Sequence, residues 1–196
     1  MEEPLLPKWD LTVKKDNSIF ESLRRYKIPL TEDGLIDTLY NHKNKYILAW
    51  SATVLRALGT EKCIDALKSV ILKPYIDVQG ISALTIGFLA GGKENKFLGN
   101  LLSDKRFRNK WYAMYALFIH ADDSAVPVIL DYAEKVIKNS KNLPICGGLM
   151  LLYLARYASD NNRARKIFNK VNKDFNMMPI IYQNELKNEF PTIFGI

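Results

Sequence analysis

Small residues recur at nearly constant spacing through most of this chain, and each is followed by apolar residues three and six positions later. Ala52, Ala83, Ala113 and Gly148 stand 31, 30 and 35 residues apart. Apolar positions three to four residues apart are typical of one face of a helix. A helical unit that repeats about every thirty residues constrains the fold strongly, because such units are stable only when they stack on one another.

The segments around these positions are expected to form successive helices, with short connections like those of antiparallel helical hairpins. Thr31, Thr60 and Asp77 are suitable N-caps, Gly59 is a suitable C-terminal stop, and Pro144 is expected in the first turn of a helix. We expect one helix after Thr31 and others over about 18–26, 44–58, 60–73, 77–90, 93–103, 105–120, 124–139, 143–158, 161–172 and 179–190.

The helices are expected to form pairs, with the small residue in the second helix of each pair. Trp50 and Trp111 each stand two residues before the small residue of their repeat, which supports a common register. A small side chain would let the two helices of a pair approach closely, while the apolar residues fill the groove between them.

Two segments carry a family resemblance. Residues 101–117 resemble a HEAT-like repeat junction, in which an apolar first helix ends in a turn containing Asp104 and a basic residue precedes a second helix rich in alanine. Residues 57–67 resemble the connection from one such repeat to the next, and the likeness covers about residues 31–158. The resemblance implies an all-α fold, a right-handed α-α superhelix (an armadillo-type, HEAT-like solenoid) of about five helical hairpins with an N-terminal cap.

The repeats depart from the family pattern at one position. The arginine that the family usually carries near the start of the second helix is replaced here by Leu48, Gln79 or Asn109. We therefore expect the Asp–Arg ladder between repeats to be weak or absent and the curvature of the stack to be irregular.

The expected organisation has three parts: a proline-containing cap over residues 1–30, a repeat stack over 31–190 and a tail over 191–196. The cap would cover the exposed end of the stack, because a terminal repeat cannot bury both of its sides.

Composition places the chain among ordinary globular proteins. It has 196 residues, 48% of them hydrophobic and 25% charged, and a formal net charge of +7. The charge favours an acidic partner, either nucleic acid or another protein, although many basic proteins bind neither. Cys63 and Cys146 lack metal-ligand spacing and are expected to be free thiols. Because no secretory signal or membrane-spanning run is visible, we expect a cytoplasmic protein with no membrane contact.

The sequence offers little that would support catalysis. His42 lies in a polar turn, and His120 with the neighbouring Asp122 and Asp123 offers poor geometry for a metal. The chain has no His-Glu dipeptide, which a HEAT hydroxylase would need, and no carboxylate four residues after Trp50 or Trp111, which would suggest a base-excision enzyme. We expect no catalytic residue, no cofactor and no metal.

Two clusters are candidates for partner binding. The first is basic, with Lys105, Arg106, Arg108 and Lys110 in six residues, and further cations occur from Arg156 onward. The second is aromatic and follows one ridge of the second helices, where core packing is the commoner role. The residues predicted to contact a partner are Lys105, Arg106, Arg108, Lys110, Trp111, Tyr112, Tyr115, Tyr153 and Arg156.

These observations predict a non-catalytic module that binds another protein, one with an acidic surface, through the inner face of the stack. By analogy of fold alone, such a stack resembles the helical-repeat immunity or inhibitor proteins that bacteria use against toxins. The alternative is a nucleic-acid-binding protein, related in shape to HEAT-like DNA glycosylases but without their catalytic carboxylate.

Overall fold

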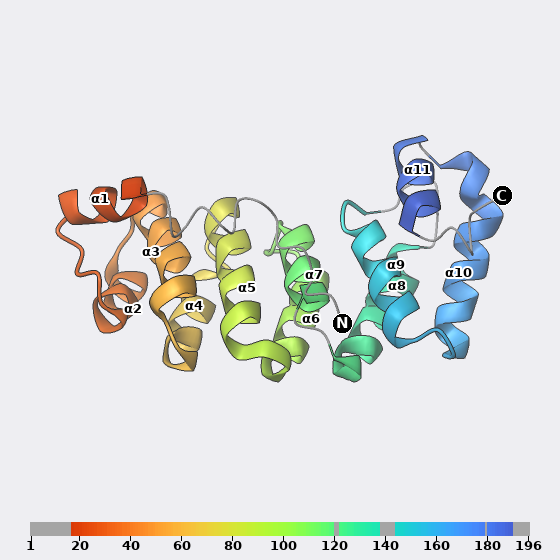
Figure 1. The fold of residues 1–196 in the computed structure, drawn as a ribbon, viewed down its shortest axis with the longest axis horizontal. Coiled ribbons are helices and arrows are strands. Elements are labelled where there is room, and N and C mark those ends of the chain that lie inside the picture. The colour runs from red at the N-terminus through yellow and green to blue at the C-terminus, as the bar shows by residue number, and fades with distance from the viewer. Residues whose placement is uncertain (1–16, 120–121, 138–143, 179, 190–196) are drawn as a thin grey trace.

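The computed structural model describes residues 17–119, 122–137, 144–178 and 180–189, and within these ranges it is all-α, with no strand. Figure 1 shows the helices side by side along the long axis of the molecule, from α1 at one end to α10 at the other. The tail over 191–196 and residues 1–16 of the expected cap lie outside the described residues.

The elements follow one another with short connections. Several first helices begin with a 3-10 turn, as at η1 (Glu61–Cys63), η2 (Gly91–Glu94) and η3 (Asp123–Ala125). The α-helices are α1 (Asn17–Arg25), α2 (Glu32–Asn41), α3 (Lys45–Leu58), α4 (Ile64–Val70), α5 (Ile76–Ala90), α6 (Asn95–Ser103), α7 (Lys110–Ile119), α8 (Val126–Val136), α9 (Gly147–Tyr157), α10 (Asn162–Asp174) and α11 (Ile180–Glu189), and η5 (Phe175–Met177) follows α10.

Side chains of the expected type cap several helices. Thr31 accepts a hydrogen bond from the amide of Gly34, and Thr60 accepts one from the amide of Lys62. Asn44 and Asn161 cap α3 and α10 in the same way. Gly91 ends α5 with a φ of 55°, a conformation that favours glycine. These polar caps satisfy amide groups that have no partner inside the helix.

Three expected helix starts are wrong. Asp77 is not the N-cap of α5, because the helix begins one residue earlier, at Ile76. Pro144 precedes α9, which begins at Gly147. The helix expected from residue 105 begins at Lys110, since the carboxylate of Asp104 accepts a hydrogen bond from the amide of Arg106 and the intervening residues form a turn.

The second helices pack against one another in sequence, with α5 between α3 and α7 and with α9 against α7. The hydroxyl of Thr85 donates to the carbonyl oxygen of Ala52 at 2.9 Å, and a Cβ on Gly87 would lie 2.8 Å from that of Ala116. The close approaches seen here therefore join successive pairs, whereas the sequence suggested close approach within a pair.

The first helices contact one another along the other layer, as α2 does with α4, α6 with α8 and α8 with α10. Helix α1 packs against α3, so the described part of the expected cap covers that end of the second-helix row. Ala52, Ala83 and Ala113 are fully buried between these layers.

The fourth repeat differs from the other three in burial. Trp50, Ile81 and Trp111, each two residues before the small residue, are partly exposed. Cys146 and Tyr153, which stand at −2 and +5 relative to Gly148, are fully buried. Cys146 precedes α9, and this helix contacts α10 and α11 as well as α7 and α8. The burial pattern of the first three repeats therefore does not extend to these positions.

Candidate functional site

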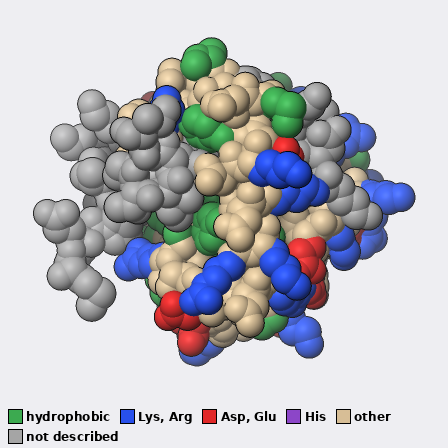
Figure 2. All heavy atoms as spheres, turned by 90° about the vertical axis from the view of Figure 1, so that its right-hand side faces the viewer, with side chains coloured by type: hydrophobic (Ala, Val, Ile, Leu, Met, Phe, Trp, Pro, Cys, Tyr) green, Lys and Arg blue, Asp and Glu red, His purple; other side chains and the backbone are tan. Residues whose placement is uncertain are grey.

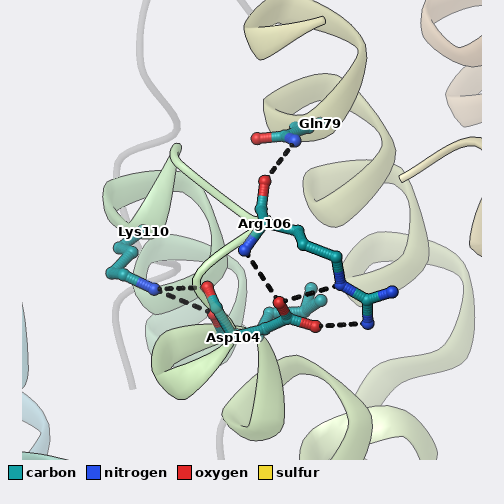
Figure 3. Close-up of polar contacts among 5 residues, drawn as sticks. Gln79, Asp104, Arg106 and Lys110 are labelled. Atoms are coloured by element: carbon teal, nitrogen blue, oxygen red, sulfur yellow. Dashed lines mark hydrogen bonds and ion pairs between the residues drawn. The ribbon is translucent and has the colours of Figure 1, made fainter. Parts of the chain in front are cut away.

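The turn before α7 contains the predicted basic cluster, and two of its four cations are held by the protein itself. Figure 3 shows Arg106 folded back on Asp104. The Asp104 carboxylate accepts from the Arg106 amide at 2.8 Å and from the guanidinium at 3.2 and 2.8 Å. These bonds favour the charged carboxylate and lower the pKa of Asp104 to about 2.

Lys110 is also turned inward. Its ammonium donates to the carbonyl oxygens of Leu101 and Asp104, at 3.2 and 3.0 Å, where α6 ends. A cation at this position satisfies carbonyl groups at the helix C-terminus and interacts favourably with the helix dipole. Burial lowers the pKa of Lys110. Lys110 is therefore tied to the structure. Lys105, Arg106 and Arg108 are exposed, and Arg106 is paired with Asp104.

Two amide side chains connect neighbouring helical pairs. Gln79, on α5, donates to the carbonyl oxygens of Lys73 and Arg106 and accepts from the amide of Arg108. Asn109 donates to the carbonyl oxygen of Ile76 at 3.2 Å. Neutral amide bonds thus hold the turn before α7 against the start of α5.

The predicted aromatic residues divide between surface and core. Trp111 and Tyr112 are partly exposed, with ring centroids 5.1 Å apart in an edge-to-face arrangement. Tyr115 is only 7% exposed and stacks on Trp111 with centroids 4.8 Å apart. Tyr153 is fully buried, and its hydroxyl donates to the carbonyl oxygen of Asp122. Burial therefore removes Tyr115 and Tyr153 from the surface that a partner could contact.

Arg156 is exposed near the end of α9. Its guanidinium carbon lies 5.3 Å from the ring centroid of Tyr157, its neighbour in the chain. This local cation–π contact leaves the charge at the surface.

A second aromatic group lies at the start of α3 and was not predicted. The ring of Trp50 lies between those of Tyr26 and Tyr46, with centroid distances of 6.4 and 6.2 Å. Tyr26 and Tyr46 are 54% and 55% exposed. The ammonium of Lys45 lies 4.9 Å from the ring centroid of Tyr46. The sequence did place Tyr46 and Trp50 four residues apart, on one face of a helix, but nothing in it brought Tyr26 to them.

A hollow of about 270 Å³ adjoins this aromatic group. The start of α3, the connection from α4 to α5, and Arg108 from the turn before α7 form its walls. Two cations and one carboxylate contribute to its lining, which consists of Lys45, Tyr46, Ala49, Pro74, Tyr75, Ile76, Asp77, Val78 and Arg108. The hollow and the aromatic group together are called the aromatic–basic surface below, with Tyr26, Lys45, Tyr46, Trp50, Tyr75 and Arg108 as its principal residues.

The structure brings one predicted site residue, Arg108, to this surface. Trp111 and Tyr112 lie on the adjoining helix, where a Cβ on Gly80 would meet the ring of Tyr112 at 2.9 Å. Helices α3 and α7, together with Tyr75 at the residue before α5, thus place aromatic side chains near the starts of neighbouring second helices. Aromatic residues beside cations are typical of surfaces that contact macromolecules.

Other candidate chemistry is limited in the described part of the chain. Nδ1 of His42 accepts a hydrogen bond from the amide of Asn44, while His120 lies outside the described residues. No group of three or more His, Cys, Asp or Glu side chains there could hold a metal ion. Among the described helices, none has both the length and the apolar character needed to cross a membrane.

Comparison with known proteins found no match for this chain among family models, curated proteins or solved structures.

Proposed function

We propose that this chain is a non-catalytic, HEAT-like helical stack that binds another protein through the aromatic–basic surface. The observation that carries the proposal is the exposure of Tyr26 and Tyr46, each more than half exposed, on either side of Trp50. Aromatic rings of this size expose a large apolar area to water unless a partner covers them, and covering that area is favourable.

The composition of the surface fits a protein partner. Tyr, Trp and Arg are the residues most often found to dominate binding energy at protein interfaces. The hollow beside Tyr46 could take one side chain of a partner, and Lys45 and Arg108 on its walls would favour an acidic one.

The packing of successive pairs supports the HEAT-like part of the proposal. Contacts run from α3 to α5 to α7 in one layer, and the bonds of Gln79 and Asn109 join the start of α5 to the turn before α7. On this scaffold we propose a cytoplasmic immunity or inhibitor role, with a bacterial toxin domain as the partner, on the analogy of fold alone.

Co-purification with the product of the neighbouring gene, followed by titration calorimetry, tests the proposal. For the complex obtained, Tyr46→Ala, Trp50→Ala and Arg108→Glu should each raise the dissociation constant about tenfold or more. Tyr40→Ala is the matched control, because Tyr40 is 52% exposed on α2 and lies outside the surface. Wild-type affinity in all three surface variants would reject this surface as the binding site.

A further inference from the structure

The exposed side of α10 has a composition unlike that of the other outer helices. Every exposed side chain of this helix is Lys, Arg or Asn, and Asn176 continues the pattern into η5. Figure 2 faces this end of the molecule and shows Lys and Arg side chains spread across it, with fewer acidic ones. The exposed residues of α10 are Asn162, Arg165, Lys166, Asn169, Lys170, Asn172 and Lys173.

The opposite side of α10 fixes the helix to the protein. Ala164, Ile167, Phe168 and Val171 are buried, at spacings of three and four residues. Helix α10 packs against α8 and α9 through this side. The cationic side is therefore held in one orientation, facing away from the core.

The two nearby carboxylates on α8, Asp131 and Glu134, are paired with Arg163, which is not one of the exposed residues of α10. Arg163 donates to Glu134 at 2.8 Å from two nitrogens and to Asp131 at 2.6 Å. Arg163 thereby joins α8 to α10 and pairs with both carboxylates, and Glu134 also interacts electrostatically with Lys166. Asp160 is almost fully exposed and lies 3.4 Å from Arg165, a weak surface pair.

We propose that the exposed side of α10 binds the phosphate backbone of double-stranded nucleic acid, without sequence preference. Lys, Arg and Asn are side chains that donate hydrogen bonds to phosphate oxygens. From Arg165 to Lys173 the helix rises about 12 Å, which matches the axial length of about three phosphates along one strand of a duplex.

The same composition argues against an acidic protein as the ligand of this side. The centre of a protein interface normally contains aromatic or aliphatic side chains, and the exposed positions of α10 carry neither. Single-stranded nucleic acid is also disfavoured, because its bases stack on aromatic side chains at most of its binding sites. The aromatic–basic surface has those side chains, and it belongs to α1, α3 and the starts of α5 and α7.

This activity goes beyond the proposed protein binding and does not depend on it. Figure 1 shows α10 at the opposite end of the molecule from α1 and α3, so the two surfaces are separate. Loss of one function by mutation should leave the other unchanged.

Fluorescence anisotropy with a labelled duplex DNA of about 20 base pairs tests the proposal. We expect a dissociation constant in the micromolar range at low salt, with log K falling against log salt at a slope of about −3 for three to four phosphate contacts. A single strand of the same length should bind more weakly. No binding of the duplex at low salt would overturn the proposal.

A matched pair of triple variants separates a defined site from the effect of net charge. Lys166→Glu/Lys170→Glu/Lys173→Glu should weaken duplex binding at least tenfold and make the salt slope shallower. Lys43→Glu/Lys93→Glu/Lys96→Glu changes the net charge equally at exposed lysines on other parts of the molecule and should keep most of the affinity. Equal losses in the two variants would overturn the proposal.

Two further measurements cover folding and ligand class. Lys166→Gln/Lys170→Gln/Lys173→Gln, checked by circular dichroism, should show reduced binding with an unchanged helical spectrum. Poly-glutamate at equal charge concentration should compete with the labelled duplex less effectively than unlabelled duplex does. Equal competition would assign the site to acidic protein and contradict the proposal.

Discussion

The side chain of Gln79 joins α5 to the turn before α7 through Arg108, whose backbone amide donates to Oε1 of Gln79 at 2.8 Å. Nε2 of Gln79 donates to the carbonyl oxygen of Arg106 at 2.8 Å, as Figure 3 shows, and to that of Lys73 at 3.0 Å. Gln79 is 1% exposed. One neutral side chain therefore satisfies three backbone groups in two successive repeats.

Gln79→Ala is expected to lower the free energy of unfolding by about 2 kcal/mol, because it leaves three partly buried backbone groups without this partner. Urea denaturation followed by circular dichroism measures the change. Asn41→Ala is the control, since the Asn41 side chain is exposed and donates to Asp37 within its own helix, and it should cost under about 0.5 kcal/mol. Equal effects of the two substitutions would show that Gln79 does not link the repeats.

Gly87→Ala should destabilise the protein by about 1–3 kcal/mol, although the same change in an unhindered helix usually stabilises. The reason is the Cβ of Ala116, which would lie 2.8 Å from the new methyl group. The Gly87→Ala/Ala116→Gly variant tests this cause. Its loss of stability should fall short of the sum of the two single losses by about 1 kcal/mol or more, and simple additivity would contradict the close approach of α5 and α7.

Tyr153→Phe separates a structural role from a binding role. Its hydroxyl donates to the carbonyl oxygen of Asp122, and its ring is fully buried. We expect a loss of about 1–2 kcal/mol in unfolding free energy with no change in affinity for the protein partner. Tyr40→Phe, at an exposed tyrosine, should change neither quantity. A weaker complex at unchanged stability would contradict this and show that Tyr153 contributes to partner binding.

Local signals in the sequence predicted the helices better than their starts. Thr31 and Thr60 cap helices as expected, because the capping bond is made within three residues. The start of α7 was misplaced because the bond from the Arg106 amide to Asp104 competes with helix formation, and the basic residues after it carry no sign of that competition.

The candidate site was harder to predict because its residues depend on tertiary packing. Charge alone did not distinguish Arg106, which pairs with Asp104, from Arg108, which lines the hollow. The position of Tyr26 beside Trp50 depends on how α1 packs on α3, and residue spacing holds no information about that contact. The repeat register also did not predict the burial of Tyr153, because residue spacing does not show which helices pack on α9.

Burial of Cys63 predicts a loss of stability at alkaline pH. Burial raises the pKa of this thiol to about 11, above that of a thiol in the unfolded chain. The folded state therefore holds the proton more tightly, so the contribution is complete below about pH 9, the ordinary pKa of the thiol, and is lost as pH rises through 11. Relative to Cys63→Ala, which lacks the thiol, the unfolding free energy of the wild type should fall by about 2 kcal/mol between about pH 8 and 11.

Urea denaturation of both proteins at several pH values measures this difference, and the pH dependence of all other groups cancels in it. The cavity that alanine leaves, and the lost bond from the thiol to the carbonyl oxygen of Thr60, lower the stability of the variant by an amount that does not depend on pH below 8. Thiol-reagent labelling gives an independent measurement, since a buried thiol with a raised pKa should react only as the protein opens. A constant difference from pH 8 to 11, with rapid labelling of native Cys63, would show that this thiol is accessible to water.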